Sequence, residues 1–124
     1  MLKTEIKNKI QKLSAEYSKE MIELRRTIHS NPETAFKEFE TTKLLYNRLN
    51  KKGLDKVSRI SETGLYALIS GNRGKCIALR ADIDALPITE NTGLKFASKN
   101  PGFMHACGHD AHSAMVYGAA LILK

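Results

Sequence analysis

Residues 104–112 are the part of the chain whose side chains could do chemistry, because they carry a thiol, three imidazoles and a carboxylate within nine positions. Thiolate and imidazole are the ligands that zinc and similar borderline metals prefer. Side chains alternate along an extended segment, so His105, Cys107 and His109 would project to one side and could meet on one ion. The spacing therefore predicts a metal site in this segment.

The simpler interpretation is that Cys107 is a small buried apolar residue and that the histidines cluster on the surface by coincidence. It suffices for one cysteine or one histidine, whereas a dense cluster of such groups is typical of a functional site. The segment also precedes a predicted helix over residues 111–124, for which Asp110 is a good N-cap. Backbone amides and the dipole at that helix end would favour a thiolate.

Two aspartates spaced by one residue, Asp82 and Asp84, follow a predicted strand. Buried carboxylates at a strand end are costly unless a cation pairs with them. Either Arg80 or a backbone cap neutralises them, or they support a metal, and taken alone the two interpretations are equally good. The Cys/His cluster about two dozen residues later favours a bridging or ligand-orienting role.

The N-terminal half is predicted to be helical. Apolar residues recur at intervals of three or four over residues 4–28, and this helix should end near residues 31–32, because the residue before a proline avoids the helical conformation. A second helix is expected over residues 33–52, with Gly53 as a left-handed cap. The apolar residues that it should bury are Phe36, Phe39, Leu44, Leu45 and Leu49.

After the second helix, the apolar pattern changes to that of strands. Residues 56–60 are predicted as a short edge strand, residues 65–69 as a second and residues 76–79 as a third. The turn-rich residues 70–74 should join the last two as an antiparallel hairpin, with Cys76 in the core. The elements together predict an α/β fold. The face that the C-terminal helix should bury comprises Met115, Val116, Ala119, Ala120 and Leu123.

The composition is that of one small globular domain, with 42% hydrophobic and 27% charged residues among 124. No apolar run is long enough to span a bilayer, and the first residues lack the apolar core of a secretion signal, so we expect a cytoplasmic protein with reduced cysteines and no membrane partner. The net charge of +7 would suit a nucleic-acid binder. However, residues 1–60 mix 14 basic with 8 acidic residues and contain no nucleic-acid motif, so we expect no such partner.

Three stretches of the chain, in order, resemble one family. They are residues 26–33 (RTIHSNPE) with Phe36 and Glu38 after them, residues 79–87 (LRADIDALP) and residues 104–110 (MHACGHD). They are similar to the N-terminal part of the M20 metallopeptidases, in the amidohydrolase branch that includes hippurate hydrolase, N-acyl-amino-acid amidohydrolases and plant auxin-conjugate hydrolases. Three ordered motifs are far more specific than any one of them.

The resemblance implies roles for individual residues. Cys107 and His109 match the first two metal ligands of the family. Asp84 matches the aspartate that supports the catalytic site close to the metal, and Asp82 stands where other branches of the family carry a histidine ligand. We therefore expect Cys107 and His109 to bind metal and Asp84 to orient the site.

The remaining matches are expected to play smaller parts. His29 and Glu33 belong to the first motif, whose role we expect to be structural, and His105 and His112 are weaker candidates for the site. The resemblance implies a phosphorylase/hydrolase-like α/β catalytic domain with two divalent ions, often manganese or zinc. Residues 1–124 would be its N-terminal portion, because the family's paired glutamates, further histidine ligands and dimerisation domain come later in the chain.

The implied activity is hydrolysis of N-acyl amino acids or similar small amides by a metal-activated water, in an enzyme that can be a homo-oligomer. A metal site normally needs three protein ligands, so residues 1–124 alone should have little activity. We also expect them to self-associate through uncovered strand edges and apolar faces. The alternative function is a non-catalytic metal-binding or interaction module, which tight metal binding without turnover would favour.

Overall fold

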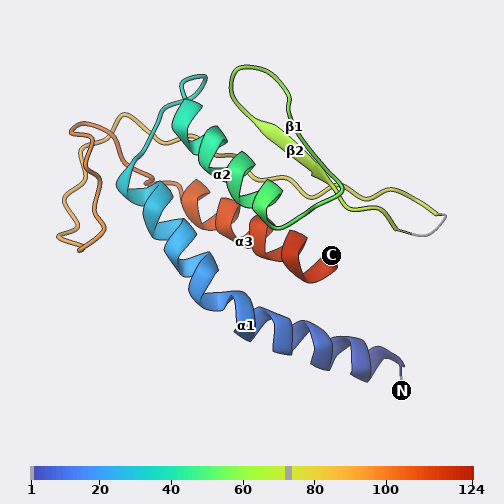
Figure 1. The fold of residues 1–124 in the computed structure, drawn as a ribbon. Coiled ribbons are helices and arrows are strands. Elements are labelled where there is room, and N and C mark those ends of the chain that lie inside the picture. The colour runs from blue at the N-terminus through green and yellow to red at the C-terminus, as the bar shows by residue number, and fades with distance from the viewer. Residues whose placement is uncertain (1, 72–73) are drawn as a thin grey trace.

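Three helices and one short hairpin make up the regular structure of this chain, which a computed structural model describes for residues 2–71 and 74–124 (Figure 1). Helix α3 lies along α1, and α2 lies against the hairpin. The predicted α/β class is confirmed. In chain order the elements are α1 (Leu2–Ser30), α2 (Phe39–Lys51), β1 (Lys56–Arg59), β2 (Leu65–Leu68) and α3 (His109–Leu123).

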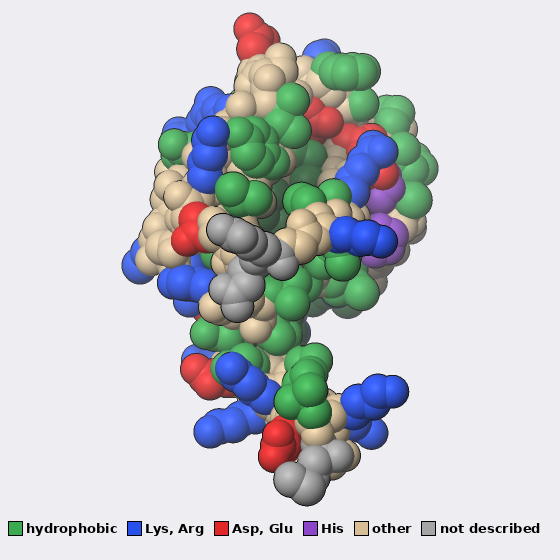
Figure 2. Space-filling model, turned by 90° about the vertical axis from the view of Figure 1, so that its right-hand side faces the viewer, with side chains coloured by type: hydrophobic (Ala, Val, Ile, Leu, Met, Phe, Trp, Pro, Cys, Tyr) green, Lys and Arg blue, Asp and Glu red, His purple; other side chains and the backbone are tan. Residues whose placement is uncertain are grey.

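Helix α1 confirms the first predicted helix, but only its C-terminal half belongs to the core. Leu24 and Ile28 are fully buried there, whereas Ile6 on the same apolar stripe is half exposed, because the start of α1 projects beyond the body (Figure 2). The helix ends at Ser30, two residues before Pro32, as the proline predicts. Within the described ranges, every helix is too short or too polar to span a bilayer.

Helix α2 begins at Phe39, later than the predicted start at residue 33. The chain turns before it, since Phe36 has a φ of 64° and an 86% exposed side chain, so the predicted burial of Phe36 is wrong. The Glu33 carboxylate explains the late start. It accepts the backbone N–H groups of Glu40 (3.1 Å) and Thr41 (2.7 Å), and thereby caps α2 from outside the helix.

The hairpin joins β1 to β2, not the second and third predicted strands. The two strands are antiparallel, with Lys56 opposite Leu68 and Arg59 opposite Leu65. The turn between them is closed by a hydrogen bond from the Ile60 N–H to the carbonyl of Gly64, whose φ of 88° favours glycine. This turn lacks the strong two-residue hairpin signal, which is why the sequence did not reveal it.

The third predicted strand, residues 76–79, does not form in the described part of the chain. A strand requires the backbone groups of a neighbour, and this segment has no ladder partner among residues 2–71 and 74–124. Ile77 is 85% exposed and Leu79 is 57% exposed. Cys76 is exposed as well, so its predicted place in the core is wrong.

Helix α3 begins at His109, with Gly108 as its N-cap in the left-handed conformation. Asp110 therefore lies within the first turn, fully buried, rather than at the cap as predicted. The predicted inner face is also wrong, because Met115 and Leu123 are about two-thirds exposed. Apolar residues occur almost all round this helix, so their spacing could not identify its inner face. The buried side consists of Asp110, Ser113, Ala114, Tyr117, Gly118 and Leu121.

The core lies where the C-terminal half of α1, helix α2 and helix α3 meet. Leu45 and Leu49 of α2 are buried as predicted, and Gly53 after α2 has the predicted left-handed conformation, with a φ of 66°. Burial of these apolar side chains is the main stabilising contribution. The buried members of the core are Leu24, Ile28, Leu45, Leu49, Leu54, Tyr117 and Leu121.

Candidate metal centre

The imidazole of His109 and the carboxylate of Asp84 meet at the start of α3. His109 Nδ1 lies 2.9 Å from Asp84 Oδ1 and 3.0 Å from the backbone oxygen of Asp84. Both acceptors contact the same ring nitrogen, so a neutral ring would carry its proton on Nδ1 and leave the lone pair of Nε2 free. A histidine held by a carboxylate in this way is typical of a metal ligand.

Asp84 is held in place by backbone contacts of the residues that follow it. The Ala85 N–H donates to the Glu33 carbonyl at 2.7 Å. Leu86 and Met104 exchange two backbone hydrogen bonds, of 2.9 and 3.0 Å. These contacts bring the segment after Asp84 against the segment that leads into His109, although the two are distant in the sequence.

Cys107 lies exposed at the bend just before α3. The extended conformation that would place three side chains on one side is not found, because His105 is buried, Cys107 is exposed and His109 already belongs to the helix. The structure thus brings His109 and Asp84 together, with Cys107 two residues away along the bend, whereas His105 is buried and makes no hydrogen bond to either of them in the described residues.

Asp82 differs from Asp84 in its partner. Arg80 Nη2 lies 2.6 Å from Asp82 Oδ1, and both side chains are largely exposed. Of the two interpretations of the aspartate pair, neutralisation by Arg80 therefore holds for Asp82, while contact with the candidate site holds for Asp84. An exposed pair of this kind contributes little to stability.

The donor set fits part of a metal site. Cys107 Sγ and His109 Nε2 are the two donors that the bend offers, and a thiolate with an imidazole suits zinc or a similar ion. Among residues 2–71 and 74–124, no three histidine, cysteine, aspartate or glutamate side chains lie close enough to form a metal-binding group. The described residues therefore offer two ligands, where a site normally requires three.

A buried ionic network lies behind His109. Asp110 Oδ2 accepts hydrogen bonds from His29 Nδ1 and Arg25 Nε, each at 2.8 Å. His29 Nε2 lies 3.2 Å from Glu90 Oε1, whose second oxygen accepts the Ser98 N–H at 2.6 Å. Burial alone would raise the pKa of Asp110, but the hydrogen bonds from His29 and Arg25 outweigh it and hold that pKa below its usual value.

Sequence reasoning anticipated only part of this network. It assigned a structural role to His29, and His29 does join α1 to α3. It missed Arg25 and Glu90, which lie 85 and 61 positions from their partners along the chain. The one available signal was that a carboxylate inside a buried helix face must find a cation.

His105 is buried without a hydrogen-bond partner at either ring nitrogen among the described residues. Its ring centroid lies 6.3 Å from that of His29. Burial lowers the pKa of His105, so its ring is neutral at pH 7. The second oxygen of Asp110, Oδ1, is likewise buried and has no partner in the described part of the chain.

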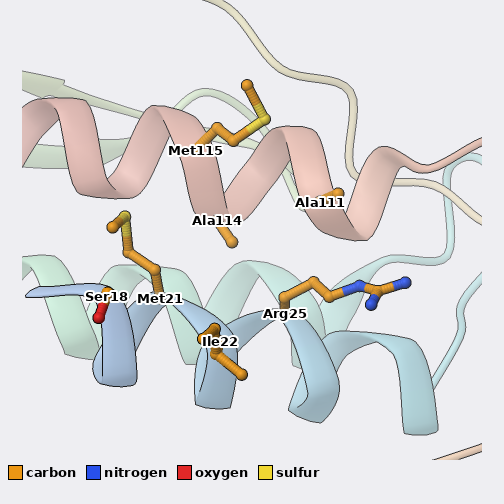
Figure 3. A pocket seen from close by; sticks show the side chains of 7 residues that line it. All are labelled: Ser18, Met21, Ile22, Arg25, Ala111, Ala114 and Met115. Carbon is orange, nitrogen blue, oxygen red and sulfur yellow. The ribbon is translucent and has the colours of Figure 1, made fainter. Parts of the chain in front are cut away.

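Surface cavities lie on either side of the C-terminal half of α1, and two of them are described by their lining residues. The first, of about 250 Å³, lies between α1 and α3, where Met21 of α1 and Ala114 of α3 point toward the opposite helix (Figure 3). The second, of about 400 Å³, lies beside the start of α2 and includes Glu33 and Asn100. Neither is lined by Asp84, Cys107 or His109. The exposed side chain of Cys107 places the candidate centre at the surface of the described residues.

Comparison with known proteins identifies relatives across most of the chain. Residues 78–124, which include all three candidate site residues, match the model of peptidase family M20/M25/M40. The chain is 51% identical over 107 residues to the N-acetyl-L-cysteine deacetylase of Bacillus subtilis, which covers 86% of this chain and 26% of that protein. It is 44% identical over 119 residues to the N-acyl-L-amino acid amidohydrolase of Geobacillus stearothermophilus, and this match covers 95% of this chain and 32% of that protein.

A solved structure has the same fold. It is a Bacillus subtilis protein described as a dinuclear metal-binding peptidase of the M20 family, with a TM-score of 0.83 and 45% sequence identity. The match covers 88% of this chain and 31% of that structure. The chain thus spans between about a quarter and a third of the length of these relatives.

Proposed function

We propose that this chain belongs to the M20/M25/M40 peptidase family and that residues 1–124 are part of the catalytic domain of a metal-dependent amidohydrolase, because residues 78–124 match the family model and relatives of that kind are 44–51% identical. The observation that carries the proposal is the contact of His109 Nδ1 with Asp84, two residues after the exposed Cys107, because it leaves Nε2 without that partner. The proposed substrates are N-acyl amino acids, the class that the names of both relatives describe.

In this proposal Cys107 and His109 bind a divalent ion, zinc or manganese, and a second ion belongs to the complete site, as the dinuclear description of the solved relative suggests. The bound metal would polarise the amide carbonyl and make water a better nucleophile at neutral pH. Asp84 keeps the proton of His109 on Nδ1 and fixes the plane of the ring. It thereby keeps the Nε2 lone pair directed at the metal position.

The two donors of this chain are too few for catalysis by themselves, so we expect residues 1–124 alone to hydrolyse N-acetyl amino acids or hippurate very slowly. Turnover can be measured by amine release with added manganese or zinc. Turnover comparable to that of an intact amidohydrolase would contradict the assignment of residues 1–124 as an incomplete site.

The metal ligands can be tested separately from turnover. Titration of the chain with cobalt(II) should produce a thiolate-to-cobalt absorption band, because cobalt replaces zinc in such sites and a Cys ligand gives this band. Cys107→Ser should abolish the band and His109→Gln should weaken cobalt binding. Cys76→Ser is the matched control, since Cys76 is also an exposed free thiol. A band that survives Cys107→Ser, or disappears with Cys76→Ser, would refute the ligand assignment.

A further inference from the structure

His29 of α1 lies 81 positions before Asp110 in the sequence, yet it contacts this residue, which is the neighbour of His109. We propose that His29 is a positioning residue that acts through Asp110 to hold the His109 ring on Asp84. The functional meaning of this role rests on the proposed function, in which His109 binds metal. The positioning itself concerns only contacts within this chain.

The first step is that Asp110 is fixed from α1. Its side chain is fully buried, and Oδ2 accepts hydrogen bonds from both His29 and Arg25 at 2.8 Å. Arg25 and His29 are four residues apart on α1, so their side chains lie on one face of that helix. Two donors from one rigid face determine where the carboxylate, and with it the first turn of α3, must lie.

The second step is that His29 is itself held. Glu90 Oε1 lies 3.2 Å from Nε2, on the opposite side of the ring from Asp110. Each ring nitrogen of His29 therefore faces a carboxylate oxygen, one from Asp110 and one from Glu90. The side chains of His29 and Glu90 are less than 5% exposed, so the ring has little freedom to turn away from Asp110.

The third step is that the start of α3 has no side-chain cap of its own. Its N-cap is Gly108, in the left-handed conformation with a φ of 92°, and it provides no side-chain capping bond. Such a cap would satisfy free N–H groups of the first turn. The side-chain contacts that anchor this turn are those of Asp110 and the Ser113 hydroxyl, which donates to the His109 carbonyl at 2.7 Å and to the Asp82 carbonyl at 3.2 Å.

The consequence for His109 follows from helix geometry. Consecutive residues of an α-helix point about 100° apart, so His109 and Asp110 turn together as one unit. Release of Asp110 from His29 lets the first turn rotate about Gly108. The Nδ1 contact with Asp84 is then lost, because a hydrogen bond weakens steeply as its angle departs from linear.

Two substitutions at position 29 separate positioning from simple stabilisation. The amide nitrogen of asparagine is as many bonds from the backbone as Nδ1, so His29→Asn retains the donor to Asp110 and loses the one to Glu90. The amide nitrogen of glutamine corresponds to Nε2, so His29→Gln retains the donor to Glu90 and loses the one to Asp110. A merely structural role predicts similar effects of both, since each removes one buried hydrogen bond.

The readout is the tautomer of His109, measured by nitrogen NMR of the imidazole in the metal-free 124-residue chain. We expect His29→Asn to leave His109 protonated at Nδ1 and His29→Gln to convert it to a mixture of tautomers. Glu20→Gln is the matched control, because it removes the charge of the acceptor in another contact between α1 and α3, the hydrogen bond from Tyr117, which lies eight residues after His109. If His29→Gln does not fold, Arg25→Gln takes its place, since Arg25 is partly exposed and also binds Asp110.

The proposal would be overturned if the His109 tautomer were unchanged in His29→Gln, or in Arg25→Gln where that variant takes its place. An equal change of the tautomer in Glu20→Gln would also overturn it. Cobalt titration then connects the result to function. We expect His29→Gln to bind cobalt about ten-fold more weakly, which is the size of effect typical for residues that orient a metal ligand. His29→Asn should bind cobalt as the unmodified chain does. Absence of a cobalt–thiolate band in the unmodified chain would refute the proposed function alone, because the tautomer measurement contains no metal.

Discussion

At the scale of single residues, chemistry depends on which partner each side chain finds. Asp82 and Asp84 have the same side chain and lie two positions apart, but Asp82 pairs with the exposed Arg80 whereas Asp84 contacts His109. Likewise, His105 and His109 belong to one motif, but only His109 has a carboxylate at its ring. The local pattern identified the candidate residues, and the partner determined what each of them can do.

His105 allows a direct test at this scale. A buried polar group without a partner costs about 1–3 kcal/mol, so His105→Leu should raise the free energy of unfolding by about 1 kcal/mol. Urea denaturation followed by circular dichroism measures the change. His112→Leu is the control, because His112 is exposed and the same replacement there should have little effect. A clear loss of stability in His105→Leu would mean that the ring has a partner after all.

At the scale of elements, the starts of α2 and α3 each depend on a carboxylate with a partner outside its own local segment. For α2 this carboxylate precedes the helix, and for α3 it lies in the first turn and pairs with α1. Helix α2 starts where the Glu33 carboxylate meets its first free N–H groups, and α3 starts at a glycine, with Asp110 held by α1. Neither start has the local capping pattern that sequence reasoning looks for. This is why both predicted helix starts were wrong while the helices themselves were confirmed.

The cap on α2 predicts a loss of stability when it is removed. Glu33→Ala should lower the free energy of unfolding by about 1 kcal/mol, since loss of a side-chain cap leaves helix N–H groups unsatisfied. Thermal or urea unfolding of the two proteins provides the comparison. Glu40→Ala should cost clearly less, because the Glu40 carboxylate pairs with Lys43 at the exposed surface. Equal losses in the two variants would argue against the capping role.

The contact between α1 and α3 should depend on pH through Glu20. Burial alone would raise the pKa of Glu20, but hydrogen bonds from Lys52 (2.6 Å) and Tyr117 (2.5 Å) outweigh it and hold that pKa below its ordinary value of 4.5. A carboxylate with a lowered pKa stabilises the fold above its unfolded pKa, and this contribution is lost as the pH falls through the folded pKa.

Glu20→Gln should therefore reduce stability near neutral pH and should reduce it much less well below pH 4.5. Urea midpoints of both proteins across this pH range measure the difference. Glu5→Gln, on the exposed part of the same helix, should leave the profile as it is in the unmodified chain. A difference between Glu20→Gln and the unmodified chain that stays constant with pH would contradict the proposed ion pair.

At the scale of the whole molecule, the chain has one core and two regions without a partner in the described structure. The start of α1 extends beyond the body with lysines around it (Figure 2), and residues 76–79 run exposed past the hairpin. The spread of these lysines over the projecting helix agrees with a solvated face. The apolar residues 76–79 are a different case, since uncovered backbone and apolar side chains tend to associate.

We expect the chain to self-associate through residues 76–79. Sedimentation velocity should show an average mass that rises with concentration, and Ile77→Lys should reduce this rise because Ile77 is 85% exposed there. Leu2→Lys replaces a comparably exposed apolar residue, 72% exposed, at the far end of α1 and should not change the behaviour. A monomer at all concentrations, or an equal effect of Leu2→Lys, would contradict this assignment.

The sequence by itself determined what depends on neighbouring residues. It predicted the three helices from their apolar repeats, the end of α1 from Pro32, the cap at Gly53 and the cluster that contains Cys107 and His109. These features arise from local conformational preferences and from the chemistry of the side chains, both of which can be read within a few positions.

Only the tertiary structure decided which distant groups meet. It selected Asp84 rather than Asp82 for His109, paired β1 with β2, and rotated α3 so that Asp110 faces His29. A helix that is apolar on almost every side has no preferred inner face of its own. Its rotation is set by the need of one buried carboxylate for a cation, and that cation is supplied by a helix some 80 positions earlier in the chain, which only packing brings near.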